Sequence, residues 1–324
     1  MCFALNISLG SVSIPFKVTL SELFLGPIQN ESWHYIIWNY RIPKAITAIL
    51  AGSALALSGL LMQTLFRNPL AGPFVLGISS GASLGVALLI MGSSIFSGLA
   101  AFEIANSISL AVGASLGSFL VLLAVLTVAT RVKDTMTLLI IGLMFGSITS
   151  AIVSVLSYFT SSEELQQYVY WSFGSLGDLY WSQLALLGVI ILIGILLSIA
   201  SIKSLNSLLL GEHYARSLGV QLKKYRYIII IATALLAGSV TAFAGPIAFV
   251  GLAVPHLTRQ LFNTTDHKVL VPAVLLSGAI LMLLCDMVAQ LPGSANVLPI
   301  NAITSIIGAP VVIWLLTRKR RMLF

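Results

Sequence analysis

Long apolar segments, repeated along nearly the whole chain, constrain the fold of this sequence more than any other feature. Mean hydropathy is +1.03 and only 8% of the 324 residues are charged, whereas about a quarter are charged in a soluble domain. A helix needs roughly 20 mostly apolar residues to cross a bilayer. Nine segments approach this requirement: 45–66, 74–91, 107–130, 136–159, 181–202, 227–243, 247–262, 269–290 and 300–317. We therefore predict an all-α polytopic membrane helical bundle that forms one domain over residues 1–324.

The N-terminal segment differs from the other apolar segments. Residues 1–9 are apolar but too short to span, and they lack the basic front and cleavage site of a signal peptide. We expect either that the natural start lies upstream or that most of a first spanning helix is missing.

The distribution of basic residues predicts the orientation of the chain. When alternate loops are assigned to the two sides, with the C-terminus in the cytoplasm, fourteen of the seventeen Lys and Arg residues fall on one side. The other side keeps Lys17, Arg41 and Lys44 and carries most of the acidic residues. This is the positive-inside pattern, so the net charge of +7 indicates a multi-pass protein of the cytoplasmic (inner) membrane, in contact with lipid, rather than a nucleic-acid partner.

A polar island at residues 211–220, G-E-H-Y-A-R-S-L-G-V, interrupts the apolar pattern. It lies within a longer cytoplasmic segment, about 203–224, and is followed by Lys223, Lys224 and Arg226. A chain with so few polar segments offers a soluble partner few places to bind. We therefore predict that this island is a docking site.

Two other patterns suggest different functions. Residues 77–81 match the G-x-S-x-G pattern of serine hydrolases, with His256 and Asp286 elsewhere in the chain. That pattern requires a strand-to-helix turn, whereas here it begins a glycine-rich membrane helix, which favours helix packing. Asp286 is an acid inside a predicted span, and such residues are functional candidates. A proton-coupled secondary transporter is the main alternative, an intramembrane serine hydrolase is the weaker one, and a hydrogen bond from Asp286 to a neighbouring helix end is the preferred interpretation.

Metal and cofactor sites are not predicted. Cys2 and Cys285 lack the spacing of metal ligands, His256 has no Cys or Asp at ligand spacing, and no G-x-x-x-x-G-K-[ST] nucleotide motif occurs. We expect no catalytic residue, metal or bound cofactor in this chain.

Two further groups of residues are open to more than one interpretation. Arg41 and Lys44 could meet carboxylates of a partner or extend to lipid headgroups. Ser147, Ser150 and Ser154 recur at helical spacing and could form either a weakly polar stripe or a helix-packing seam.

Several stretches together resemble the iron-complex and vitamin B12 family of ABC importer permeases. They are R-I-P-K-A-I-T-A-I-L-A-G-S-A-L-A-L-S-G from Arg41, Q-T-L-F-R-N-P-L-A-G-P from Gln63, L-G-I-S-S-G-A-S-L-G from Leu76, the polar island from Gly211, G-P-I-A-F-V-G-L-A-V-P-H from Gly245 and I-G-A-P-V from Ile307. The resemblance implies ten helices per permease, the first largely missing here. It also implies a second permease copy as a homodimer, two cytoplasmic ABC ATPases that bind the ATP, and a periplasmic or lipid-anchored substrate-binding protein.

The resemblance also implies roles for particular residues. The ATPase-coupling segment would include Gly211, Glu212, His213, Ala215, Arg216, Leu218 and Gly219. A cytoplasmic gate maps onto Asn68, Leu70, Thr135 and Met136, and docking of the binding protein onto Arg41 and Lys44. The translocation pathway would run at the dimer axis along the family's fifth helix, which carries Ser147, Ser150 and Ser154, along its tenth helix, and past a short helix near residues 161–173. The implied cargo is an iron complex, most often a ferric siderophore, with haem and cobalamin as alternatives.

Overall fold

The computed structural model describes residues 2–24, 26, 30–92, 107–129, 135–290 and 296–317, and these residues form helices without any strand. The N-terminal helices are α1 (Cys2–Ser8), α2 (Phe16–Leu23), α3 (Glu31–Ile36), the π-helical η1 (Ile37–Arg41) and α4 (Ile42–Leu65). The middle of the chain forms η2 (Pro73–Leu76), α5 (Ile78–Ile90), α7 (Ser107–Ala129), α8 (Thr135–Phe159), α9 (Ser162–Ser172) and α10 (Trp181–Ala200). The remaining helices are α11 (Ile202–Leu209), α12 (Glu212–Ser217), α13 (Leu222–Thr233), η3 (Ala234–Gly238), α14 (Ser239–Ala244), α15 (Val250–Phe262), α16 (His267–Ala289) and α17 (Ile300–Thr317). The all-α prediction is confirmed.

Six helical stretches of the described chain are long and apolar enough to cross a bilayer: Glu31–Leu65, Ile108–Val128, Thr137–Phe159, Trp181–Ala200, Leu222–Ala244 and His267–Ala289. Six of the nine predicted spans correspond to these stretches. Segments 74–91 and 300–317 contain the shorter apolar helices Ile78–Ile90 and Ile300–Trp314, and segment 247–262 contains the 13-residue α15. Gly77, with φ of +71°, separates η2 from α5, and Gly245, with φ of +75°, ends α14 before α15 begins.

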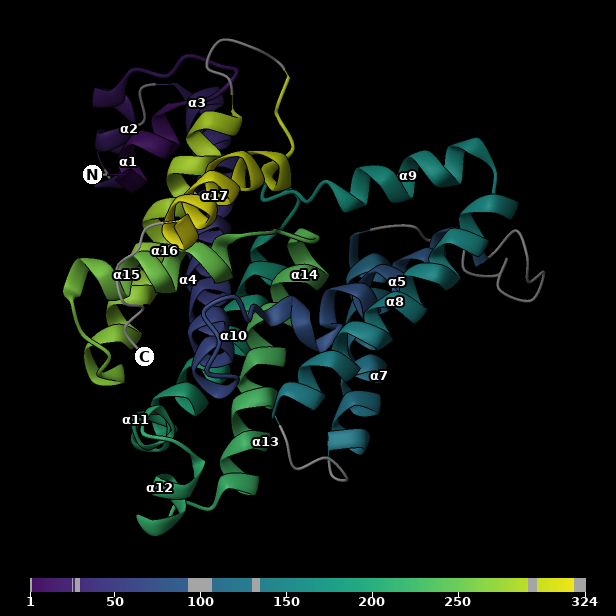
Figure 1. Ribbon diagram of the computed structural model, residues 1–324. Helices are drawn as coiled ribbons and strands as arrows, with labels where there is room; N and C mark the ends of the chain where they lie inside the picture. The colour runs from purple at the N-terminus through teal and green to yellow at the C-terminus, as the bar shows by residue number, and fades with distance from the viewer. Residues whose placement is uncertain are drawn as a thin grey trace.

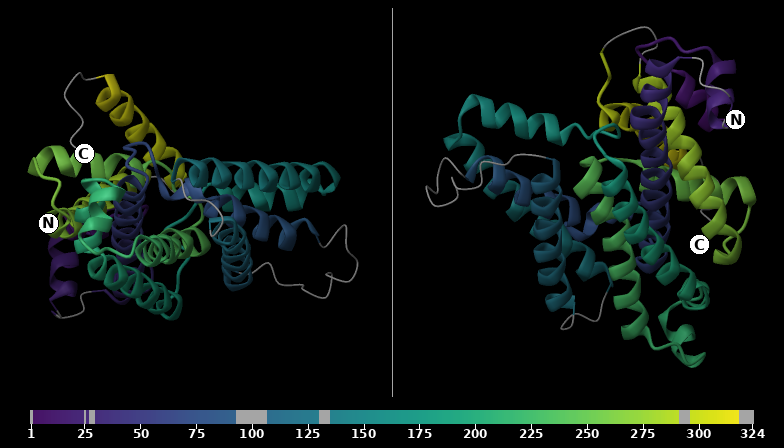
Figure 2. Two further views of the ribbon diagram at one scale, coloured as in Figure 1. Left: turned by 60° about the horizontal axis from the view of Figure 1, so that its bottom comes forward. Right: turned by 180° about the vertical axis from the view of Figure 1, so that it is seen from behind.

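Helix α4 lies at the centre of the bundle, packed against α10, α13, α15 and α16 (Figures 1 and 2). Its tightest contacts are made at glycines. A Cβ atom on Gly52 would collide with the carbonyl oxygen of Gly278 in α16, and one on Gly59 would collide with the carbonyl oxygen of Gly251 in α15. Close approach of helix backbones at small residues is how membrane helices associate when lipid supplies no hydrophobic drive.

A second glycine contact joins α5 and α7. Added Cβ atoms on Gly81 and Gly85 would meet backbone atoms of Gly117 and Gly113. Gly81 belongs to the 77–81 pattern for which the sequence favoured helix packing, and its contact with Gly117 confirms that role. Helix α8 packs against α5 and also contacts α7. Helix α9 follows the end of α8 and contacts α5 (Figure 1).

Different helices lie at the two ends of the bundle. Helices α1–α3 lie at one end, and α11 and α12 lie at the opposite end, in both the front view and the view from behind (Figures 1 and 2). Because α4 and α16 run side by side between these ends, they connect the two regions in which the sequence predicts docking.

The close contact of α4 with α15 predicts that Gly59→Ala destabilises the bundle, because the added methyl group cannot fit without moving one backbone. Overpacking of this kind costs about 1–3 kcal/mol. Gly188→Ala in α10 is the matched control, since its Cβ would lie 3.9 Å from the nearest atom, Leu50 Cδ1. The free energy of unfolding, measured by SDS titration in mixed micelles, should fall for Gly59→Ala alone. Equal values for the two variants would contradict this packing.

Candidate functional site

The polar island, residues 211–220 and hereafter the foot, is a short helix held between two sharp turns. Gly211 has φ of +104° and starts α12. Gly219, with φ of +80°, ends it: its N–H donates to Arg216 O at 2.9 Å, and the Val220 N–H donates to Ala215 O at 3.0 Å. This pair of hydrogen bonds is the Schellman motif, in which glycine adopts the left-handed conformation at low cost.

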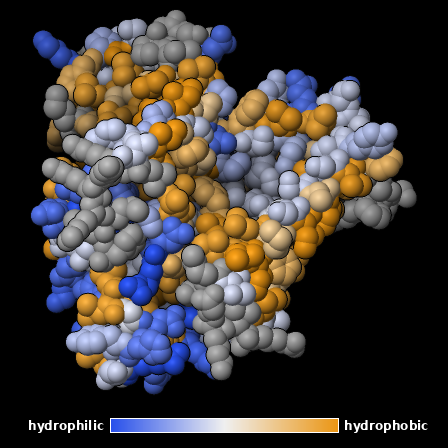
Figure 3. All heavy atoms as spheres, in the orientation of Figure 1, coloured by the Kyte–Doolittle hydropathy of each residue, from blue (hydrophilic) through white to orange (hydrophobic). Residues whose placement is uncertain are grey.

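The foot projects polar and apolar side chains outward while resting on one small residue. Ala215 is fully buried, and Glu212 pairs with Arg226 of α13 at 3.3 Å. Tyr214 and Leu218 are 53% and 57% exposed, and His213 and Arg216 are also exposed. Tyr214 and Leu218 are four positions apart and so lie on one side of the foot. The polar residues of this end are visible at the bottom of Figure 3.

Basic residues surround the foot. Lys203, Lys223 and Lys224 are exposed on the helices that flank it. Arg67, which follows α4, lies beside Gly211, because a Cβ there would be 3.7 Å from Arg67 Nη1. This end therefore presents positive charge around an amphipathic helix.

The predicted gate residues are only partly described. Asn68 accepts a hydrogen bond from the Leu70 N–H at 2.9 Å and so shapes the turn after α4, and Leu70 is 46% exposed. Helix α8 begins at Thr135, but the side chains of Thr135 and Met136 lie outside the described residues. The gate assignment stays a prediction.

The three serines of α8 lie on one exposed face. Ser147, Ser150 and Ser154 are all exposed, and the hydroxyls of Ser147 and Ser154 donate to carbonyls of their own helix at 3.1 and 3.0 Å. A hollow of about 430 Å³ lies along this face and is lined by Ser147 and Ser150 together with Ser80 and glycines. Because hydroxyls paired within a helix attract a passing solute weakly, this surface is suited to passage rather than to tight binding.

The predicted docking bases are engaged within the chain. Arg41 is 9% exposed. Its Nη1 donates to the carbonyls of Ile7 and Ser8 at 2.8 and 3.0 Å, and its Nη2 donates to the carbonyl of Val12. The guanidinium thus caps the end of α1. The sequence suggested instead that Arg41 is an exposed base.

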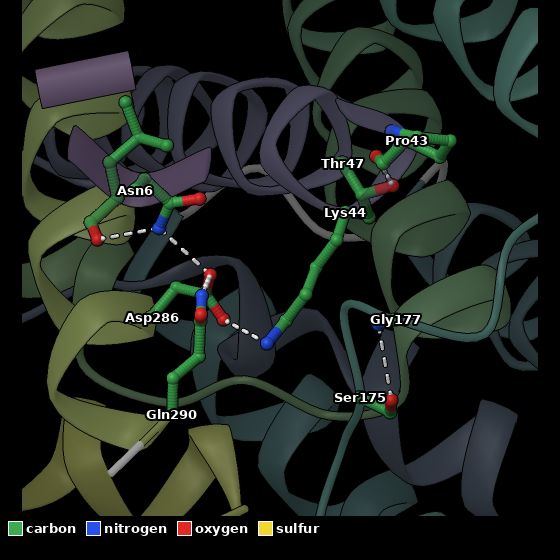
Figure 4. Close-up of polar contacts among 9 residues, drawn as sticks. Asn6, Pro43, Lys44, Thr47, Ser175, Gly177, Asp286 and Gln290 are labelled. Carbon is green, nitrogen blue, oxygen red and sulfur yellow. Dashed lines mark hydrogen bonds and ion pairs between the residues drawn. The ribbon is translucent and has the colours of Figure 1, made fainter. Parts of the chain in front are cut away.

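Lys44 forms an ion pair with Asp286 of α16 at 3.1 Å (Figure 4). The same carboxylate accepts hydrogen bonds from Asn6 at 2.9 Å and Gln290 at 2.6 Å. The pair lines a cavity of about 620 Å³ at the α1–α3 end of the bundle. Asp286 therefore has the hydrogen-bonded role that the sequence favoured, and a partner's carboxylate would have to compete with it for Lys44.

The geometry gives the hydrolase alternative no support. Ser79 Oγ is buried and has no hydrogen-bond partner among the described residues. Asp286 is occupied by Asn6, Lys44 and Gln290, while His256 contacts Gln260 of its own helix at 3.4 Å. In the described part of the chain, no group of three or more His, Cys, Asp or Glu side chains could hold a metal ion.

A group of buried polar side chains near the foot was missed from the sequence. Gln63, Thr64, Arg259 and His267 are each at most 4% exposed, and hydrogen bonds connect them to Asn206 of α11. The available signal was the presence of polar residues at the ends of apolar segments, but their partners are up to 203 positions apart in sequence.

The buried pair at the α1–α3 end predicts that Lys44→Met destabilises the protein, because Asp286 keeps a buried charge without its counter-ion. Removing one partner of a fully buried pair costs about 3–5 kcal/mol, and the 19% exposure of Lys44 makes the expected loss smaller. Lys44→Met with Asp286→Asn should recover most of this loss, whereas Lys17→Met, at an exposed lysine, should change little. SDS titration of the four proteins checks the result, and a Lys44→Met variant as stable as Lys17→Met would rule out a stabilising pair.

Known proteins resemble this chain over most of its length. The vitamin B12 import system permease protein BtuC of Klebsiella pneumoniae is 40% identical over 285 residues, which cover 88% of this chain and 83% of that protein. The protein of the same name from Salmonella paratyphi A is 41% identical over 286 residues, covering 88% and 84%.

Solved structures share the architecture. An inward-facing structure assigned to the metal-chelate type of ABC transporter superposes with a TM-score of 0.84 at 31% identity, covering 97% of this chain and 94% of that one. PsaBC from Streptococcus pneumoniae, in complex with a Fab, has the same fold with a TM-score of 0.55 at 18% identity, covering 84% and 89%.

The FecCD transport family matches residues 1–318. Proteins of this family are permeases that work with ABC ATPases and substrate-binding partners. With its apolar helices, its foot and its relatives taken together, this chain is an integral membrane protein and belongs to the FecCD transport family as the permease subunit of an ABC importer.

Proposed function

We propose that this permease imports a bulky metal chelate, and that ATP hydrolysis on separate subunits bound at the foot drives the import. The observation that carries the proposal is the foot itself. It is a short helix with exposed Tyr214 and Leu218, surrounded by bases and fixed at both ends by glycine turns. A rigid, amphipathic projection of this kind suits insertion into a cleft of a soluble partner. ATP would be bound by that partner, and the permease itself would need no cofactor and would catalyse no reaction.

A homodimer accounts for the exposed face of α8. Leu143, Met144 and Ile148 are 48%, 55% and 56% exposed beside the serine stripe. A second copy placed against this face would enclose a pathway between two α8 helices, lined by Ser147, Ser150 and Ser154. Each copy would then present one foot to one of two ATPases, and Asn68, Leu70, Thr135 and Met136 would close the pathway near that end.

The positive-inside bias supports an orientation with the foot in the cytoplasm, in the cytoplasmic (inner) membrane, with the C-terminus also cytoplasmic. The α1–α3 end would then face the substrate-binding protein, either periplasmic or lipid-anchored. Lys44, 19% exposed in its side chain and lining the cavity, is the base that a partner's carboxylate would reach. Arg41 would shape the same surface through its contacts with the carbonyls of α1.

Cobalamin is the first candidate cargo. The two BtuC relatives, about 40% identical to this chain, are named for vitamin B12 import, which favours cobalamin over the ferric siderophore that the family resemblance implied. The weakly polar face of α8 suits any large chelate, so a ferric siderophore and haem are alternative outcomes of the cargo test.

Cargo identity is tested in proteoliposomes that contain the permease with its ATPase and binding-protein partners and enclose ATP. We expect accumulation of radiolabelled cyanocobalamin that requires ATP and stops with a non-hydrolysable analogue. Unlabelled haem and a ferric siderophore serve as competitors. Uptake of one of these in place of cyanocobalamin would reassign the cargo. Uptake driven by a proton gradient without the ATPase would contradict the proposed function and favour a secondary transporter.

The foot predicts that Gly219→Pro uncouples ATP hydrolysis from uptake. Proline fixes φ near −65°, which is incompatible with the observed +80°, and it removes the N–H that donates to Arg216 O. Gly219→Asn is the matched control, because asparagine tolerates the left-handed conformation. We expect at least about a tenfold loss of cargo moved per ATP for the proline variant and little change for the asparagine variant. Wild-type coupling in both would refute the assignment of the foot.

A further inference from the structure

A continuous set of hydrogen bonds joins helix α11, which carries the foot, to α4, α15 and α16. It contains Asn206 of α11, Gln63 and Thr64 of α4, Arg259 of α15, and His267 with its N-cap residue Asp266 at the start of α16. We refer to these six residues as the polar link.

The half of the polar link nearest the foot is centred on Asn206. Its Nδ2 donates to Asp266 Oδ1 at 2.6 Å, and its Oδ1 accepts from the backbone N–H of His267 at 2.9 Å and lies 2.7 Å from His267 Nδ1. Because a carboxylate only accepts, the amide nitrogen must face Asp266 and the oxygen must face His267, so Nδ1 carries the proton. The backbone N–H of Lys268 and the Asn206 amide lower the pKa of Asp266, which keeps this acceptor ionised.

The other half of the polar link reaches the centre of the bundle. His267 Nε2 lies 2.8 Å from the hydroxyl of Thr64. Arg259 Nη1 donates to Gln63 Oε1 at 2.8 Å, and its Nη2 lies 3.5 Å from Thr64 Oγ1. Gln63 Nε2 in turn donates to the carbonyl of Leu252 in α15 at 3.1 Å. The hydrogen bonds therefore run without a gap from α11 to α15.

The burial of these groups implies a requirement beyond stability. Gln63, Thr64 and His267 are fully buried, and Arg259 is 4% exposed. Burying polar groups is costly unless each has a partner, and well-packed apolar side chains often hold helices together as well as or better than buried charged groups do. What a hydrogen-bonded set adds is a defined geometry, since its members fit only in specific relative positions.

The polar link lies on the mechanical route from the foot to the rest of the bundle. Helix α12 packs against α11 and α13, and α11 packs against α4, α10 and α16. The contact of α11 with α16 includes the hydrogen bonds between Asn206 and His267, and His267 in turn contacts Thr64 of α4. A displacement of the foot that carries α11 with it must either move α4 and α16 or break these bonds.

We propose that Asn206, Thr64 and His267 are positioning residues for energy coupling, and that they transmit displacement of the foot to α4, α15 and α16. This inference rests on the proposed function of the foot. Thr64 and His267 are fully buried, and Asn206 is partly buried. They act by fixing α11 to the central helices, so that work done on the foot reaches the pathway rather than being lost in local movement of α11.

The experiment compares Thr64→Val, Thr64→Ser and Asn206→Leu in proteoliposomes with the partner subunits and radiolabelled cyanocobalamin. Val removes the hydroxyl with little change of shape, whereas Ser keeps it. The matched control is Thr47→Val in the same helix, whose fully buried hydroxyl bonds only to Pro43 O within α4 among the contacts described. The measured quantities are cargo moved per ATP hydrolysed and the affinity of the purified permease for the ATPase.

We expect Thr64→Val and Asn206→Leu to lower cargo moved per ATP at least about fivefold, with ATPase affinity unchanged because the foot is intact. Thr64→Ser and Thr47→Val should match the wild type. Wild-type coupling in Thr64→Val and Asn206→Leu would overturn the proposal. Equal losses in Thr47→Val and Thr64→Val would also overturn it, since any buried hydroxyl would then have the same effect. A wild-type permease that moves cargo without ATPase would instead refute the proposed function itself.

Discussion

The close approach of helix backbones at glycine is the interaction on which the rest of this structure depends. Gly52 and Gly59 in α4 leave room for the backbones of α16 and α15, and the α5–α7 contact uses the same device. In a bilayer, lipid chains are as apolar as the helix surfaces, so helices associate through packing and hydrogen bonds rather than through the hydrophobic effect. A central helix bound this closely to its neighbours behaves with them as one unit.

This unit connects two polar regions at opposite ends of the bundle. At one end, α4 and α16 are joined by the Lys44–Asp286 pair beside the cavity. At the other, they are joined to each other and to α11 by Thr64, His267 and Asn206. Asp286, Thr64 and His267 are buried, Lys44 and Asn206 are partly buried, and the apolar length of the two helices lies between the two sets of contacts. The arrangement suits a subunit in which force enters at the foot and the response is needed far away along the same helices.

The sequence was sufficient to predict the helical class, the approximate positions of the long helices and the foot, because each depends on local pattern. Segment 181–202 matches α10 and segment 136–159 matches α8 within two residues. It was insufficient for the break at Gly77, whose positive φ falls inside the predicted segment 74–91, whereas the break at Gly245 falls between the predicted segments 227–243 and 247–262. It also did not predict that Arg41 caps α1 or that His267 contacts Thr64, since both pairings join distant segments and leave no periodic signal. Arg41 and Lys44 appeared exposed because their partners are distant in sequence.

The central claim is that ATP-driven displacement of the foot moves α4 and α16 as one unit and so reaches the opposite end of the bundle. The most direct measurement places spin labels at residue 39, which is exposed near the far end of the α4 stretch, in the two copies of the proposed homodimer. Electron-spin distances are then compared in nucleotide-free and ATP-trapped complexes. The account predicts a change on the order of a few Å. An unchanged distance in complexes that hydrolyse ATP and move cargo would contradict it.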